Sequence, residues 1–303
     1  MKKRGSTGEY KPAVLLVGIL LIFWQWAVGF FHFPSYILPA PSEIVQALLE
    51  SFSLIMSHAK VTILEAVLGF GAAVLLAVIL ALLMDSILWV KKALYPLLVI
   101  SQTIPIITVA PLFLIWFGYG VLPKVIVVTL VCFFPIVISL LDGLAAVDEE
   151  LINLLRTMGA GKKYIFINVK LPGAMPSFFS GLKIASAYSI MGAVIGEWLG
   201  ASKGIGVFMT RSQHSFLLDK VFAGIVVITV LSLGVFAVIK FLERLLMPWL
   251  FVNEGEITYT KGIIKLKKIL GILTILLAVG LFSGCSSDTT VPEGEASGEP
   301  IKV

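Results

Sequence analysis

Charged residues are scarce in this chain, and their scarcity limits what kind of protein it can be. They make up 14% of its 303 residues, whereas hydrophobic residues make up 58% and the mean hydropathy is +1.02. A soluble domain has about a quarter charged residues, so the composition indicates an integral membrane protein. Basic residues that flank membrane segments account for the net charge of +5, and we expect no binding to nucleic acid.

The residue types that build catalytic and metal centres are also few. The chain has two cysteines, Cys132 and Cys285, and its three histidines, His32, His58 and His214, are scattered along the sequence. No ligand spacing joins them into a metal site. The nucleotide-binding pattern G-x-x-x-x-G-K-[ST] is missing as well. We therefore expect no metal, no directly bound cofactor and no enzyme activity, and the energy source of any active process is expected on another chain.

Long apolar runs dominate what is present. A hydrocarbon core of about 30 Å needs about 20 apolar residues in a helix. Six continuous runs meet that length: 12–33, 61–84, 93–117, 121–144, 174–199 and 221–246. The sequence therefore predicts an all-α, polytopic membrane protein with six transmembrane helices.

The distribution of lysine and arginine predicts the orientation of these helices. Short loops rich in both residues stay on the cytoplasmic side of a membrane. Residues 1–11, 91–92 and 148–172 are rich in them, although the contrast with the opposite side is weaker in the second half. We expect a multi-pass protein of the bacterial plasma membrane with a cytoplasmic N-terminus.

The segment 148–172 is polar and charged, and it lies between two of the apolar runs. Acidic residues at 148–150 suit the N-terminus of a helix, and Gly159 tolerates the positive φ at which a helix ends. A second short element is predicted over 162–169, and Leu171 and Pro172 are predicted to break it. Periodicity alone leaves two interpretations open, namely a compact helix-turn-helix that projects from the membrane and an ordinary solvated loop.

The spacing within this segment resembles the cytoplasmic signature of ATP-binding-cassette importer permeases. That signature is Glu-Ala-Ala, three residues, Gly, nine residues, Ile, one residue, Leu-Pro. The chain matches it from the glycine onward but has Asn-Leu-Leu in place of Glu-Ala-Ala. The residues that correspond to the signature, and that the resemblance implies contact an ATPase, are Asn153, Leu154, Leu155, Gly159, Ala160, Val169, Leu171 and Pro172.

The resemblance implies a fold, a function and a set of partners. The fold is that of a type I ABC importer permease, and the segment is the coupling helix that docks into a groove of a cytoplasmic ATPase dimer. ATP is used by that partner. The resemblance also implies a second permease subunit, here a homodimer around one path, and an extracytoplasmic lipoprotein binding protein that delivers the solute. Membrane lipid surrounds the assembly.

Other motifs narrow the resemblance to one branch of these permeases. Residues 38–44, 105–118 and 172–183 resemble the nitrate, sulfonate and taurine branch. Residues 196–211 are most similar to members assigned to uptake of the hydroxymethylpyrimidine precursor of thiamine. We therefore expect import of that pyrimidine, with aliphatic sulfonate, taurine or nitrate as the alternative.

Small residues form a stripe along the fifth apolar run, at positions 181, 185, 189, 192, 196 and 200. Such a stripe allows another helix backbone to approach closely. It predicts either packing within one subunit or a helix that lines the translocation path or contacts a second subunit. The candidate pore or gate residues are Ser189, Gly192, Gly196, Glu197 and Arg211.

Ionisable groups in or near the spans call for separate predictions, because they are costly in a membrane without water or a partner. Glu197 is expected either to reach the membrane interface or to act as a gate or substrate-facing acid paired with Arg211. Lys183 is predicted to extend to the headgroups. Asp85 and Asp142, close to span ends, are predicted to be solvated.

Two predictions concern local backbone structure. Ser42 is predicted to cap a short extracytoplasmic helix whose apolar positions 44, 48, 52 and 55 share one face. Pro105, Pro111 and Pro135 are predicted to bend the spans that contain them.

Residues 253–303 are predicted to be separate from a six-span permease domain at 1–252. A basic stretch at 265–268, an apolar stretch at 269–279 and small residues before Cys285 resemble a bacterial lipoprotein signal, with Cys285 as the lipidated residue. The polar residues 286–300 predict a flexible tether. These features indicate a permease fused to the start of a binding protein, and a seventh membrane segment with an unstructured tail is the alternative.

Two other functional classes are alternatives to the importer permease. An ion-coupled secondary transporter predicts paired buried charges or inverted repeats with broken helices, which the sequence does not show clearly. A membrane anchor leaves the spacing from Gly159 to Pro172 unexplained.

Overall fold

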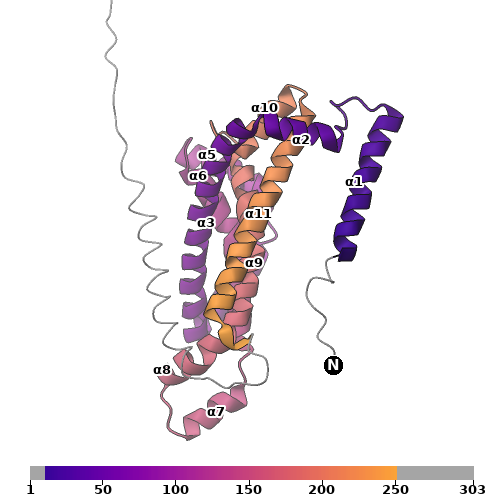
Figure 1. Ribbon diagram of the computed structural model, residues 1–303. Helices are drawn as coiled ribbons and strands as arrows, with labels where there is room; N and C mark the ends of the chain where they lie inside the picture. Colours follow the sequence, from indigo (N-terminus) through magenta and orange to yellow (C-terminus); the bar gives the residue numbers. More distant parts are fainter. Residues whose placement is uncertain (1–10, 251–303) are drawn as a thin grey trace, which may run out of the picture. The chain divides into compact units, whose positions relative to one another are not determined.

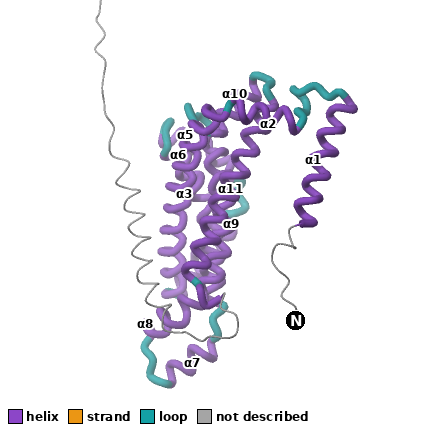
Figure 2. The backbone as a smooth tube through the Cα atoms, viewed as in Figure 1, coloured by secondary structure: helices purple, strands orange, loops and turns teal. Residues whose placement is uncertain are grey.

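The computed structural model describes residues 11–250, and the tail with Cys285 lies outside them. Within this range the regular elements are all helical (Figure 2). They are α1 (Lys11–Phe31), α2 (Pro41–Glu50), α3 (Phe52–Ser86), α4 (Leu88–Ser101), α5 (Ile106–Phe117), α6 (Leu122–Ala145), α7 (Glu149–Thr157), α8 (Lys162–Ile165), a π-helical turn (Phe166–Lys170), α9 (Leu171–Trp198), α10 (Ile205–His214), α11 (Leu218–Leu246) and a 3-10 turn (Pro248–Leu250).

Five of the described helices are long and apolar enough to cross a membrane, or up to six spans if α4 and α5 together form one. The third apolar run is therefore not one straight helix. It bends by 100° between Ser101 and Ile106, because Pro105 has an extended backbone and lacks the N–H that would continue the helix. The predicted bend at Pro105 is confirmed, and it is a complete break.

Helix α6 packs against both α3 and α9, and these two helices also contact each other. Three fully buried alanines of α3, Ala73, Ala77 and Ala81, step by one helical turn through this core. Glycines bring α6 and α9 together, since a Cβ on Gly143 would lie 2.7 Å from Cβ of Ser177 and one on Gly181 would lie 2.7 Å from the carbonyl of Pro135. Small residues thus provide the close contact that membrane helices need.

The two ends of the bundle are built differently. Helices α7 and α8 project at one end, whereas α2 and α10 lie across the other (Figure 1). At the start of α2, Pro41 takes the first helical position and the carboxylate of Glu43 accepts a 2.9 Å hydrogen bond from the Ala40 N–H. The predicted Ser42 cap is wrong, because Ser42 lies one residue inside the helix and bonds the Gln25 amide instead.

The apolar face predicted across positions 44–55 is only partly formed. Ile44 and Ile55 are buried, but Phe52 is 54% exposed. The reason is that α2 ends at Glu50 and α3 begins at Phe52, so the helical period restarts between them.

Many large apolar side chains of α1, α3 and α11 point away from the protein, among them Phe23, Leu75 and Phe241. In water such a surface would be unfavourable, whereas a bilayer solvates it. Helix α1 is the least buried span, and its contacts with the rest include the Gln25–Ser42 hydrogen bonds and the ring of Trp24 against Phe222.

Candidate functional site

Helix α7 presents an apolar face at the projecting end of the bundle. Asp148 caps the helix by accepting a 2.8 Å hydrogen bond from the Glu150 N–H. Leu151, Leu154 and Met158 are spaced i, i+3, i+7 and are all exposed, Met158 by 74%. Ile152, on the same helix, is buried. The described residues leave this face uncovered.

The helix ends where the sequence predicted. Gly159 has φ +86°, and a side chain there would be strained. Its N–H donates to the carbonyl of Arg156, and the Ala160 N–H donates to the carbonyl of Leu155. This is the double hydrogen bond of a Schellman motif, with glycine at the left-handed position. Asn153, at the departure from the family signature, is exposed and accepts from Arg156 at 3.3 Å.

Leu171 and Pro172 do not break the helix, and that prediction is wrong. The chain is helical from Lys162 to Trp198, with Val169 in the widened π-turn that precedes α9. Proline in a regular helix lacks an N–H and clashes with the carbonyl four residues earlier. The π-turn just before Pro172 relieves both problems, since it changes the hydrogen-bonding pattern at that point. The projecting segment is thus joined to the span α9 by a continuous helix.

An ion pair connects this junction to a second span. Nζ of Lys170, the last residue of the π-turn, lies 2.7 and 2.9 Å from the two carboxylate oxygens of Asp85 near the end of α3. The pair is partly buried. The predicted solvated position of Asp85 is therefore wrong. The predicted headgroup position of Lys183 is wrong too, because its Nζ lies 2.7 Å from Glu243 of α11.

Glu197 lies in a buried hydrogen-bond network at the opposite end of α9. Its carboxylate accepts from the Thr62 hydroxyl and from the Gly206 N–H, both at 2.6 Å. Thr62 Oγ1 in turn accepts from the Ile205 N–H at 2.9 Å. The network joins α3, the end of α9 and the start of α10, and Glu197 is 1% exposed. Glu197 therefore does not reach the membrane interface.

The predicted pair between Glu197 and Arg211 does not form. The Arg211 guanidinium is exposed and donates instead to the carbonyl of Ser202 at 3.2 Å. The carboxylate of Glu197 is enclosed by backbone, since a Cβ added to Gly204 or Gly206 would collide with it. A cation cannot approach it from the α10 side.

A second buried charge lies beside this network and was missed in the sequence. Glu65 of α3 is fully buried, and its Oε1 lies 2.6 Å from Nζ of Lys124 at the start of α6. Its Oε2 has no hydrogen-bond partner among the described residues. An acid within a span is itself the signal that should prompt a search for a partner, but nothing in the sequence identifies Lys124, which is 59 residues away.

The stripe of small residues on α9 packs against α6. A Cβ on Gly192 would lie 3.3 Å from Cα of Val128, and one on Gly196 would lie 3.1 Å from Cα of Lys124. Ser189 is buried and donates to the carbonyl of Ser186. These contacts favour the interpretation of packing within one subunit, and the side chains of α9 that remain accessible lie on its other face.

That other face contributes to a hollow of about 480 Å³ at the break between α4 and α5. The break contributes Ser101, Gln102 and Pro105, α6 contributes Phe134, and α9 contributes Tyr188 and Met191. Tyr188 and Met191 are each more than two-fifths exposed.

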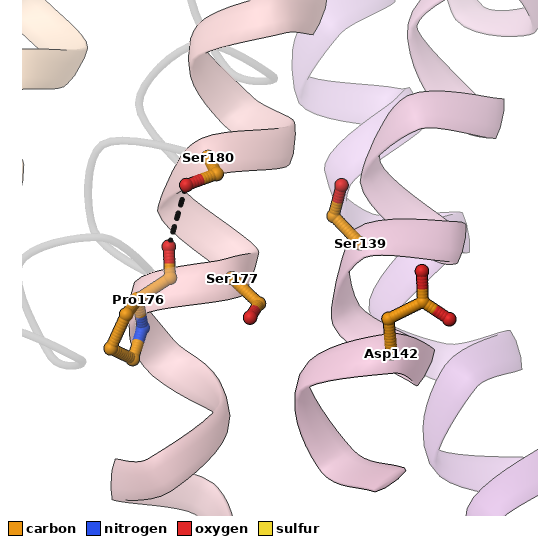
Figure 3. Close-up of a pocket in the computed structure, with 5 residues that line it drawn as sticks. All are labelled: Ser139, Asp142, Pro176, Ser177 and Ser180. Carbon is orange, nitrogen blue, oxygen red and sulfur yellow. Dashed lines mark hydrogen bonds between the residues drawn. The ribbon is translucent and has the colours of Figure 1, made fainter. Parts of the chain in front are cut away.

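A smaller hollow of about 300 Å³ lies between α6 and α9 (Figure 3). Ser139, Asp142, Ser177 and Ser180 line it, and Ser180 donates to the carbonyl of Pro176 at 3.0 Å. Asp142 is exposed, as predicted. Within the described residues, no three histidine, cysteine or acidic side chains come close enough to hold a metal ion.

Comparison with known proteins decides the family. Residues 73–248 match the model of the binding-protein-dependent transport system inner membrane component. The chain belongs to this family. The permease is 40% identical to the formylaminopyrimidine transport permease of Halalkalibacterium halodurans over 232 residues. The aligned region covers 76% of this chain and 92% of that protein.

Two further relatives are named for other substrates. The riboflavin transport permease of Chloroflexus aurantiacus is 33% identical over 240 residues, 78% of this chain and 89% of that protein. The taurine transport permease of Escherichia coli is 30% identical over 250 residues, 80% of this chain and 89% of that protein. The permease therefore belongs to the nitrate, sulfonate and taurine branch of ABC importers.

It follows that the chain is a multi-pass inner membrane component of an ATP-driven importer, which works with an ATPase and a binding protein, and is not an enzyme. The buried Glu65–Lys124 pair and the broken third span are features that the secondary-transporter alternative predicted. The family match shows that an importer permease contains them too.

Proposed function

We propose that the permease imports the hydroxymethylpyrimidine precursor of thiamine, as a homodimer driven by a cytoplasmic ATPase dimer. The main support is the similarity to a formylaminopyrimidine permease over nearly the whole of that protein. The riboflavin relative is also named for a nitrogen heteroaromatic solute. Aliphatic sulfonate or taurine is the alternative, favoured by relatives of 28–30% identity.

The segment at 148–172 is proposed as the contact with the ATPase. It projects from the bundle and presents Leu151, Leu154 and Met158 on one exposed face. Apolar side chains at this spacing are the anchors by which a helix binds in a groove of a partner. This end of the molecule would then face the cytoplasm, together with the N-terminus, and α2 and α10 would face the binding protein.

The contact is also linked to the spans that would move. Movement of α7 would pass to α9 through the continuous helix from Lys162 and to α3 through the Lys170–Asp85 pair. ATP hydrolysis by the partner would thereby change the arrangement of the spans without reacting with this chain.

Co-purification with the ATPase tests the contact. Leu154→Asp places a charge on the proposed docking face and is expected to abolish co-purification and uptake, with normal membrane insertion. Leu217→Asp is the matched control, since Leu217 is also exposed but follows α10 at the other end. Equal co-purification of the two variants would contradict the proposed contact.

Uptake separates the substrates. Cells that contain the permease, its ATPase and its binding protein are expected to accumulate radiolabelled hydroxymethylpyrimidine, and a hydrolysis-deficient ATPase is expected to stop accumulation. ATP-dependent uptake of taurine or an alkanesulfonate, without uptake of the pyrimidine, would refute the proposed substrate and leave the family assignment intact.

A further inference from the structure

The break between α4 and α5 places non-helical backbone within an apolar run that could otherwise form one straight span. Residues 102–105 join the two helices at a bend of 100°. Ile106 and Ile107 lie in the first turn of α5, so their N–H groups have no hydrogen-bond acceptor within that helix. In a membrane such backbone persists only where protein covers it or where it lines a water-filled cavity. A hollow of about 480 Å³ lies at this break, and water in it would satisfy these backbone groups.

The side chains around the hollow form an aromatic and apolar wall with a few polar groups. Phe134, Tyr188 and Met191 supply the wall. Gln102 is exposed and offers both an amide donor and a carbonyl acceptor. The Ser101 hydroxyl donates to the carbonyl of Leu98, which leaves its lone pairs free to accept. Small-molecule sites have this composition, and their volumes are about 300–1,000 Å³.

Charge distinguishes the solutes that fit. Within the described residues, no aspartate, glutamate, lysine, arginine or histidine lines the hollow. A sulfonate or nitrate would find no cation there to replace the water molecules that binding displaces, and this is costly. A planar, uncharged ring with nitrogen atoms would stack on Tyr188 and exchange hydrogen bonds with Gln102.

We propose that this hollow, formed by the α4–α5 break, α6 and the Tyr188 face of α9, is a solute-binding site within the permease for a planar, uncharged nitrogen heteroaromatic ring. The inference rests on the proposed function and adds where and by which side chains the ring is held. It assigns Tyr188 and Gln102 a part in specificity in addition to that of the binding protein.

Direct binding tests the inference. The purified permease–ATPase complex in nanodiscs, without binding protein, is titrated with radiolabelled hydroxymethylpyrimidine. The wild type is expected to bind it saturably, and excess taurine is expected not to compete. Tyr188→Ala is expected to weaken binding about tenfold or more, since base–aromatic stacking is lost, whereas Tyr188→Phe keeps the ring and most of the affinity. Gln102→Leu removes the polar partner and is also expected to weaken binding.

Tyr95→Ala is the matched control, because Tyr95 of α4 is comparably exposed but does not line the hollow. It is expected to bind like the wild type. Co-purification of the ATPase is measured on every variant and is expected to match that of the wild type, which shows that each complex is assembled.

Three results would overturn the inference. Wild-type uptake of the pyrimidine together with unchanged binding in Tyr188→Ala would reject the site and leave the proposed function standing. Uptake of a sulfonate alone would reject the proposed function, and the inference with it. Labelling of Tyr188→Cys, with Cys132 and Cys285 replaced by alanine, by a lipid-soluble but not a water-soluble maleimide would show that lipid fills the hollow.

Discussion

Removing Lys124 should destabilise the permease more than removing both partners of its ion pair. Lys124→Met keeps most of the apolar stem, which packs on Gly196, and removes only the ammonium. It leaves the carboxylate of Glu65 fully buried with no cation within hydrogen-bond distance. Breaking a buried pair in this way costs about 3–5 kcal/mol.

The double variant Glu65→Leu/Lys124→Met has no charge to bury. Replacement of a buried ion pair by apolar residues of similar volume is often neutral or stabilising, so we expect it to lie within about 1 kcal/mol of the wild type. The energies of the single variants should therefore be strongly non-additive, as expected for residues in direct contact.

Unfolding of the purified protein in mixed micelles, followed by tryptophan fluorescence as denaturing detergent is added, gives the free energies for the four proteins of this cycle. A loss below about 1 kcal/mol in Lys124→Met, or additive losses in the double variant, would show that the pair is hydrated or absent.

Three further predictions follow from the other contacts. Asp85→Lys and Lys170→Asp should each reduce the amount of solute taken up per ATP hydrolysed. The double variant should recover it, because the two charges are again paired, in reverse order. If the double variant does not recover, the pair has no role in coupling. Glu197→Ala should lower stability by about 1–3 kcal/mol because it leaves the Gly206 N–H unpaired, although the Thr62 hydroxyl can still donate to the carbonyl of His58. Arg211→Ala should have little effect on stability. Gly159→Ala should lower stability by about 1 kcal/mol because of its positive φ, and Gly161→Ala, at φ −71° with open space around it, should not; equal thermal shifts would contradict the assigned backbone strain.

The sequence predicted the structure best where a residue type strongly favours one environment or one backbone conformation. Continuous apolar runs predicted the spans, and Gly159 predicted the end of α7, because few other residues tolerate its backbone angle. The break at Pro105 was predicted only as a bend, since its angle depends on how α5 packs against α6.

Pairings between distant residues could not be predicted. Asp85, Lys183 and Glu197 each looked close to water in the sequence, yet each has a partner from another helix. Which helix faces a charged residue depends on tertiary packing, which local periodicity does not contain. The same holds for the stripe on α9, whose spacing showed close packing but not that α6 is the partner.

Reconstitution tests the central claim most directly. The permease, its ATPase and its binding protein are incorporated into proteoliposomes, and accumulation of radiolabelled hydroxymethylpyrimidine is measured with and without ATP. We predict accumulation that requires ATP and the binding protein and that is lost in Leu154→Asp. Accumulation that persists without ATP, or that Leu154→Asp leaves unchanged, would contradict the account of a permease driven through the segment at 148–172.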